Sequence, residues 1–202
     1  TGRRPRTAGF GLDTIGVALG MQGQIVVDEH METSVPGVYA AGDVVGEPMF
    51  VYVAAYGGAL AAENALTGNT RTLDLTAVPA VTFTDPAVAT VGITEAQARV
   101  RGVAPLVSQL SMEHVPRSLA ARDTRGFVKL VADPASRKIL GAQILASEAG
   151  EMITEVALAV KFGLTIEDIT STFHPYLTLS EGVKLAAQTF DKDVGKLSCC
   201  AA

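Results

Sequence analysis

Tryptophan is absent from this sequence of 202 residues, and cysteine occurs only twice, as the adjacent pair Cys199 and Cys200. Two neighbouring thiols near the end of the chain cannot link distant parts of a fold. The sequence therefore lacks the disulfide framework that is typical of small secreted proteins. Scarce cysteine is common in a reducing compartment, so we expect a cytoplasmic protein.

An excess of positive charge and a long apolar run are missing too. The net charge is −5 and the basic cluster at residues 3–6 is short, which argues against nucleic acid as a partner. The longest apolar stretch, residues 50–62, is interrupted by Gly57 and Gly58 and is too short to cross a membrane. No signal peptide opens the sequence. We expect no nucleic-acid binding and no membrane insertion.

Several motifs that carry chemistry are also missing. A Gly-x-Gly-x-x-Gly fingerprint does not occur, because Gly9 and Gly11 are followed by Thr14 where glycine would be required. There is no P-loop, no ordinary zinc-ligand spacing and no hydrolytic triad. This sequence therefore does not encode whatever would bind the adenine half of a dinucleotide.

The hydrophobic content of 48% is enough for a substantial core, and the sequence pattern changes near residue 79. Before that point, two strands are predicted at residues 24–28 and 38–43, and a buried helix at 50–65 that ends at Gly68 and Asn69. Residues 70–78 have the composition of a linker. We expect residues 1–78 to be part of one domain and residues 79–202 to form a complete one.

Beyond residue 79 the pattern predicts an α+β fold. Strands are expected at residues 80–84 and 88–93, separated by an Asp-Pro turn, and a hairpin at 127–132 and 138–146. Thr94 and Gln97 match a capping box, so a helix should begin there. Further helices are expected at 148–162, 165–171 and 179–190.

The cysteine pair is the first candidate for chemistry. Adjacent thiolates near a chain end can capture a soft metal ion, and Lys192 and Lys196 nearby favour the reactive thiolate form. Cys199 and Cys200 could also be incidental tail residues or close a strained vicinal disulfide. The residues by themselves leave these interpretations open.

Asp43 is a second candidate. It follows a predicted strand and the small residues Ala41 and Gly42, which would let a ligand approach the backbone closely. Its carboxylate could accept hydrogen bonds from sugar-like hydroxyls, or it could simply cap the next turn.

A third candidate is Tyr176, in a predicted loop before the last helix, where a phenol could bind a ligand or contact an ion. Thr178 and Glu181 match a second capping box, which gives Glu181 a structural explanation. His174 precedes a proline, and a lone histidine is more often structural than catalytic.

Taken in order, several segments resemble the flavoprotein disulfide reductases. They are residues 1–5 (TGRRP), 33–43 (TSVPGVYAAGD), 79–86 (PAVTFTDP), 88–92 (VATVG) and 178–181 (TLSE). In that family such segments lead from the NAD(P) domain into the FAD domain and then open the dimerisation domain. The resemblance implies an α+β dimerisation domain, an antiparallel sheet with helices, preceded by a partial FAD-binding segment.

Two departures place the resemblance in one branch of the family. Where lipoamide dehydrogenases and glutathione reductases carry a catalytic histidine, this sequence has Tyr176, and phenols, which titrate near pH ~10, cannot easily replace that base. Those enzymes also lack a tail like Cys199–Cys200. These two departures, together with the sequences of residues 50–55 and 184–190, resemble those of the mercuric reductases.

That resemblance implies a homodimeric enzyme that uses FAD and NADPH to reduce Hg(II) to Hg(0), with small thiols as further partners. Asp43 would bind the ribityl chain of FAD, and the backbone near Val51 would face its isoalloxazine ring. Cys199 and Cys200 would capture Hg(II) and pass it to a redox-active cysteine pair of the other subunit. Tyr176 would lie beside the metal on this path.

The resemblance also implies that the FAD glycine motif, the redox-active cysteines and the NADPH domain lie before Thr1. We therefore expect this chain to be inactive by itself. Two alternatives stay open: a non-enzymatic dimerisation and Hg(II)-binding module, and another family member such as a dihydrolipoamide dehydrogenase.

Overall fold

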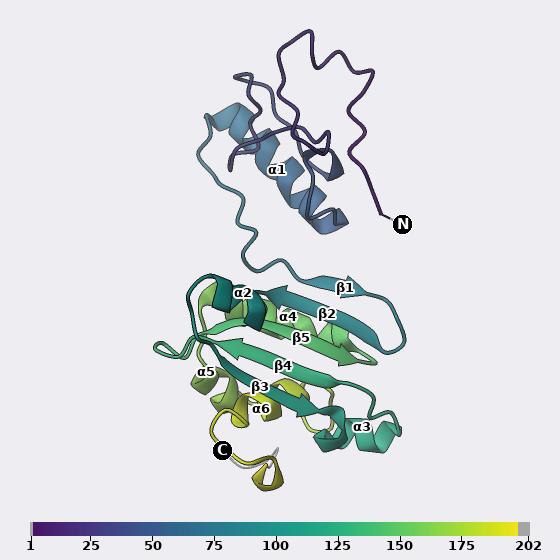
Figure 1. Cartoon of the computed structure of the whole chain (residues 1–202), viewed down its shortest axis with the longest axis vertical. Coiled ribbons are helices and arrows are strands. Elements are labelled where there is room, and N and C mark those ends of the chain that lie inside the picture. The colour runs from purple at the N-terminus through teal and green to yellow at the C-terminus, as the bar shows by residue number, and fades with distance from the viewer. Residues whose placement is uncertain (1, 198–202) are drawn as a thin grey trace. The chain divides into compact units, whose positions relative to one another are not determined.

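The computed structural model describes residues 2–197. The chain divides into two compact units, Thr1–Leu75 and Thr76–Ala202, which we call the N-terminal and the C-terminal unit. In Figure 1 the first runs from purple to blue and the second from teal to yellow.

The N-terminal unit is built on one long helix. It contains the short 3-10 helix η1 (Asp43–Val45) and α1 (Val51–Thr67). α1 ends at Gly68, whose left-handed φ of 80° suits a residue without Cβ and lets its N–H bond the carbonyl of Asn64. The small core of this unit consists of Met31, Leu60 and Ala61.

The two strands predicted at residues 24–28 and 38–43 are wrong. Among the described residues of this unit, only isolated bridges form, at Leu19↔Ile25, Val27↔Thr33 and Glu32↔Tyr39. A strand is stable beside partners of matching length. Here residues 24–28 form bridges only with Leu19 and Thr33, and residues 38–43 only with Glu32. They remain irregular extended chain.

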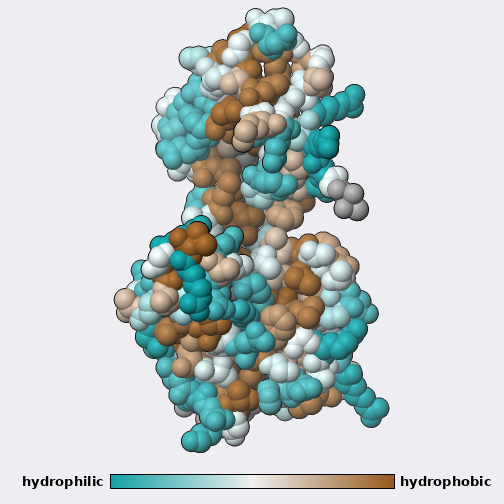
Figure 2. Space-filling model, in the orientation of Figure 1, coloured by the Kyte–Doolittle hydropathy of each residue, from teal (hydrophilic) through white to brown (hydrophobic). Residues whose placement is uncertain are grey.

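The helix predicted at residues 50–65 is confirmed, but its complete burial is wrong. Only Gly57, Leu60, Ala61 and Asn64 are buried in α1. The side chains of Val51, Tyr56 and Leu66 are 82%, 74% and 88% exposed. Figure 2 shows apolar side chains on the visible surface of this unit. α1 therefore presents apolar residues to solvent as well as to its core.

The C-terminal unit is a five-stranded antiparallel sheet with helices (Figure 1). Its strands follow the spatial order β1-β2-β5-β4-β3, and every neighbouring pair is antiparallel. They are β1 (Ala80–Thr82), β2 (Ala87–Gly92), β3 (Leu106–Ser111), β4 (Phe127–Ala132) and β5 (Ile139–Ala146).

Helices connect and cover these strands. They are α2 (Glu95–Val100), α3 (Pro116–Ala121), α4 (Ala149–Phe162), α5 (Ile166–Ser171) and α6 (Glu181–Gln188), with 3-10 turns η2 (Met112–His114) and η3 (Val194–Lys196). α4 packs on β2 and β5, and α6 on β3 and β4, so both helices cover one face of the sheet.

The core of the C-terminal unit lies between that sheet face and these two helices. Leu130 and Ile144 of the sheet and Ile153 and Val183 of the helices are at most 1% exposed. Burying each such side chain stabilises the fold by about 1.5–3 kcal/mol. α6 is buried along its whole length, including Glu181, Lys184 and Gln188.

Most elements predicted for this unit are confirmed. The hairpin is the β4–β5 pair, in which Phe127 lies opposite Leu145. The capping box before α2 is present, with the Thr94 hydroxyl accepting from the N–H of Gln97. The strand β3 and the helix α3 were not predicted. Within residues 2–197, no helix has the length and apolar character needed to cross a membrane.

Candidate functional site

The candidate site residues fall into three groups. Asp43 and Val51 belong to the N-terminal unit and Tyr176 to the C-terminal unit. Cys199 and Cys200 lie outside the described residues.

Asp43 stands at a sharp change of backbone direction. Gly42 before it has φ 85°, a value that favours glycine, and Asp43 opens η1. The Asp43 carboxylate does not make the capping bond considered from the sequence; its Oδ2 accepts from Nη1 of Arg3 at 3.5 Å. The same Nη1 donates to the carbonyl of Met49 at 2.7 Å. With a side chain that is 48% exposed, Asp43 can accept hydrogen bonds from a ligand.

The start of α1 is a second feature that can bind a ligand. Phe50 is its N-cap residue and no side chain caps the first turn. The first α-helical bond into the cap joins the N–H of Ala54 to the carbonyl of Phe50 at 2.9 Å. Backbone N–H groups at such a helix start, together with the helix dipole, attract a carbonyl oxygen or an anion. The backbone at Val51 is suited to face such a group.

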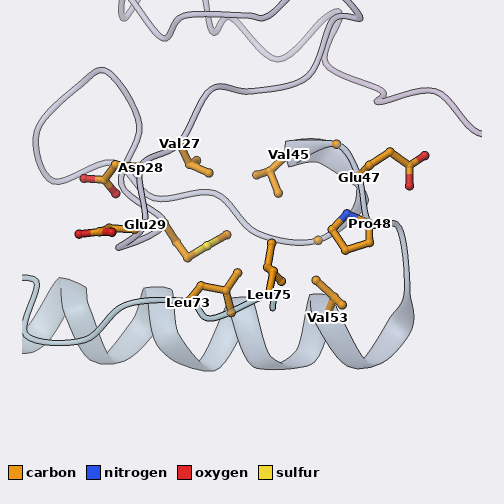
Figure 3. A pocket seen from close by; sticks show the side chains of 12 residues that line it. Val27, Asp28, Glu29, Val45, Glu47, Pro48, Val53, Leu73 and Leu75 are labelled. Carbon is orange, nitrogen blue, oxygen red and sulfur yellow. The ribbon is translucent and has the colours of Figure 1, made fainter. Parts of the chain in front are cut away.

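Sequence reasoning missed a hollow of about 200 Å³ in this unit. Figure 3 shows the apolar side chains of Val27, Val45, Leu73 and Leu75 directed into it, whereas the nearby carboxylates point outward. Neither Asp43 nor Val51 lines it. Its walls come from distant segments of the unit, so no local sequence signal would have revealed it.

Tyr176 is presented on the loop between α5 and α6, which we call the Tyr176 loop (residues 172–180). The tyrosine side chain is 68% exposed. The hydroxyl of Thr178 donates to the carbonyl of Pro175 at 2.8 Å. The phenol is therefore accessible to a ligand while the backbone around it is held.

His174 anchors the same loop. Its ring is 5% exposed, with Nε2 at 2.6 Å from Oε1 of Glu155 in α4 and Nδ1 at 3.1 Å from the carbonyl of Thr172. The hydrogen bond to Glu155 raises the pKa of His174 above its usual value, whereas burial of the ring and the charge of Lys184 act in the opposite direction.

The second predicted capping box, at Thr178 and Glu181, is only half present. Oε2 of Glu181 accepts from the N–H of Thr178 at 3.1 Å, but Ser180 is the N-cap residue and the Thr178 hydroxyl bonds elsewhere. Glu181 is 2% exposed, so it holds the end of the loop from inside the fold. Glu181 therefore has a structural role, as predicted. The hydrogen bonds differ from those of a capping box because α6 begins after Ser180, so Thr178 is not its N-cap residue.

Glu155 and Lys184 are the residues of this region that sequence reasoning missed. Nζ of Lys184 donates to the carbonyl of Thr172 at 3.1 Å, the same oxygen that His174 contacts. Glu155 precedes His174 by 19 residues, too far for a helical or turn pattern to connect them. Across residues 2–197, no group of three or more His, Cys, Asp or Glu side chains is arranged to hold a metal ion.

Two family profiles match the chain. The profile described as pyridine nucleotide-disulphide oxidoreductase, dimerisation domain, matches residues 78–187. The profile described as pyridine nucleotide-disulphide oxidoreductase matches residues 1–58. Both agree with the predicted fold class, an α+β dimerisation domain preceded by a partial segment of another domain.

Curated relatives match over the whole chain. A mercuric reductase of Streptomyces lividans is 55% identical over 201 residues, which are 100% of this chain and 42% of the relative. A mercuric reductase of Shigella flexneri is 52% identical over the same length, 36% of that relative. The chain thus spans less than half the length of these relatives.

Among solved structures, LpdA from Mycobacterium tuberculosis superposes with a TM-score of 0.85 at 30% identity, covering 94% of this chain and 41% of that one. The Cu(II) complex of the HOCl-induced flavoprotein disulfide reductase RclA from Escherichia coli has the same TM-score at 29% identity, with 94% and 43% coverage. The described fold is therefore one that solved oxidoreductases also adopt.

Proposed function

The chain belongs to the pyridine nucleotide-disulphide oxidoreductase family, and from that premise we propose that it is the C-terminal region of a mercuric reductase. The observation that carries the proposal is the identity of 55% with a mercuric reductase over 201 residues. The exposed Tyr176, which stands where other branches of the family have a histidine, supports it. The whole protein would contribute to mercury resistance by reducing Hg(II).

In this proposal residues 1–78 are part of an FAD-binding domain and residues 79–202 are the dimerisation domain with its cysteine tail. The match of the dimerisation profile to residues 78–187 supports a homodimer. We also propose a cytoplasmic location, because the substrate is handled by reduced thiols.

The residues around Asp43 fit the chemistry of FAD. The accessible Asp43 carboxylate offers an acceptor for ribityl hydroxyls, and the start of α1 at Val51 offers backbone donors for a ring carbonyl. Gly42 has no Cβ, so it can adopt its positive φ of 85° and leaves the backbone there open to close approach by a ligand. FAD, when bound, supplies the transfer of an electron pair from NADPH.

Cys199 and Cys200 would capture the metal, and Tyr176 would lie beside its path. Hg(II) is a soft ion that binds thiolates strongly, so exchange from small thiols to Cys199 and Cys200 and then to another thiol pair moves it without release. The overall reaction balances as NADPH + Hg(II) → NADP⁺ + H⁺ + Hg(0), with two electrons passing to the metal. This transfer does not require a substrate thiol to be protonated as it leaves. A tyrosine at position 176, instead of a histidine that acts as acid and base, is therefore compatible with it.

The test is Hg(II)-dependent NADPH oxidation by the FAD-loaded protein that contains this chain, with and without Cys199→Ser/Cys200→Ser. We expect the double variant to lose activity when Hg(II) is presented as a complex with a small thiol. Ser198→Ala is the matched control and should stay near wild type. Absence of Hg(II)-dependent oxidation by the wild type would refute the proposal.

Two further measurements separate the alternatives. Hg(II) titration of the 202-residue chain against a competing thiol, beside the double serine variant, shows whether the tail captures mercury without the rest of an enzyme. Turnover of dihydrolipoamide by the larger protein would favour the dehydrogenase alternative, for which Tyr176 is the wrong residue.

A further inference from the structure

The Tyr176 loop combines a highly exposed residue with strongly buried anchors. Tyr176 is 68% exposed, whereas the ring of His174, two residues earlier, is 5% exposed. Glu181, which accepts from the loop at Thr178, is 2% exposed. A loop held on both sides of its exposed residue presents that residue in a defined place.

The anchor on the N-terminal side is an ion pair. The carbonyl of Thr172 can only accept, so Nδ1 of His174 must carry a hydrogen to bond it. Nε2 must carry a hydrogen as well to donate to an ionised Glu155. These contacts favour a ring that is protonated on both nitrogens, and the pair of His174 and Glu155 links the loop to α4.

The charged groups facing this ring come from two elements. Glu155 of α4 favours the imidazolium directly. Lys184 of α6 opposes it through its positive charge, and its Nζ donates to the same Thr172 carbonyl. The histidine thus lies where α4, α6 and the loop meet, and the cost of burying its charge is offset mainly by Glu155 and, to a smaller extent, by the hydrogen bond to the Thr172 carbonyl.

We propose that His174 and Glu155 are a positioning pair for Tyr176, which fixes the place where the phenol meets the metal ion. The inference rests on the proposed function for its consequence in catalysis, and on the geometry above for the positioning itself. Neither residue touches the substrate. Their effect passes through the backbone of residues 174–176.

The experiment uses the protein labelled with 3-fluorotyrosine, whose four tyrosines in this chain give separate fluorine signals. Tyr176→Phe identifies the Tyr176 signal. In the wild type we expect the Tyr176 signal to relax as fast as that of a residue fixed in the folded unit, because the loop is held on both sides of the tyrosine. A Tyr176 signal that relaxes slowly, like that of a freely moving side chain, overturns the proposal, and this arm needs no variant to fold.

Variants sharpen the test. Glu155→Gln and His174→Asn should shift or broaden the Tyr176 signal at neutral pH, whereas the exposed controls Glu151→Gln and His114→Asn should not. If the control variants change the Tyr176 signal equally, the effect is not specific to His174 and Glu155, and the proposed pair is contradicted.

In the Hg(II) assay, Glu155→Gln should lower kcat/KM by about tenfold. An unchanged kcat/KM beside a changed fluorine spectrum would refute the catalytic consequence of the pair. Absence of wild-type Hg(II) reduction refutes the proposed function instead, and the fluorine spectra still decide the positioning.

Discussion

The two units of this chain bury their apolar residues to very different extents. In the C-terminal unit one continuous core joins β2–β5 with α4, α5 and α6. Among the described residues of the N-terminal unit the buried cluster contains only Met31, Leu60 and Ala61, while Phe10, Met21 and Leu66 are at least 67% exposed. Single exposed apolar residues also occur in the C-terminal unit, where Phe83 and Phe173 are 91% and 97% exposed. The two units therefore differ in the size of their cores: the C-terminal unit is organised around one large core, and the N-terminal unit around a small one.

The largest expected effect tests the core of the C-terminal unit. Leu130 is 0% exposed at the centre of β4, so Leu130→Ala should lower the free energy of unfolding of this unit by about 2–5 kcal/mol. Hydrogen exchange of peptides from residues 76–197 measures it. The control Leu60→Ala removes the same side chain from the N-terminal unit and should leave that exchange unchanged. Equal effects of both variants on the C-terminal unit would mean that the units do not unfold separately.

A smaller effect is expected at the polar centre of the N-terminal unit. The buried Asn64 side chain donates to the carbonyls of His30 and Arg71 at 2.9 and 2.8 Å and accepts from the N–H of Arg71 at 3.0 Å. Asn64→Ala should leave these groups unsatisfied and cost about 1–3 kcal/mol. Limited proteolysis within residues 2–75 should become faster.

The control for this variant is Glu63→Gln, which changes only a surface ion pair with Arg71. We expect it to leave the rate of proteolysis near wild type. If Asn64→Ala is as resistant as wild type, the polar centre does not hold the N-terminal unit together.

A third prediction concerns the segment after α6. Arg137 contacts Glu167 of α5, and its Nη2 donates to Oδ2 of Asp191 at 2.5 Å. Val194 and Leu197 then pack against the core. Arg137→Gln should raise amide exchange at residues 189–197 several-fold, as expected for a partly exposed ion pair. Arg99→Gln, which breaks a similar pair within α2, should leave these residues unaffected.

The smallest expected effect is electrostatic. The side-chain hydrogen bond from Arg125 lowers the pKa of Asp123 to about 2. A lowered pKa contributes stability above the ordinary carboxyl range, and this contribution is lost as pH falls through about 2. Thermal unfolding midpoints of wild type and Asp123→Asn should therefore differ slightly at neutral pH and converge in strong acid. A constant difference at every pH would contradict this assignment.

Local sequence patterns predicted the elements whose signals are local. α4, α5 and the β4–β5 hairpin follow from apolar periodicity, capping residues and a turn. The strand β3 was missed because Ser108 occupies a core position, where its hydroxyl donates to the carbonyl of Ala186 at 2.6 Å. A polar residue at that point hides the alternation that predicts a strand.

The strands predicted in the N-terminal unit do not form, for the opposite reason: the local pattern indicates a strand, but the tertiary structure of the described residues provides no partner strand. Residues 24–28 have a convincing β-branched pattern, but strand formation depends on a neighbouring segment, and that information is not in the pattern itself. The sequence likewise gave no indication of the hollow lined by Val27, Val45 and Leu73, whose walls meet only in the folded unit.

The sequence by itself determined which residues are candidates for chemistry, Asp43, Tyr176 and the cysteine pair, because residue type and order along the chain carry that information; their roles stay predictions. It also determined α1 and the elements of the C-terminal unit that depend on contacts three or four residues apart. Only the tertiary structure decided that Glu155 meets His174 and that α6 is buried with Glu181 and Lys184. Such pairs depend on how α4, α6 and the loop pack together, since contacts between distant residues are set by the whole fold and leave no periodic trace in the chain.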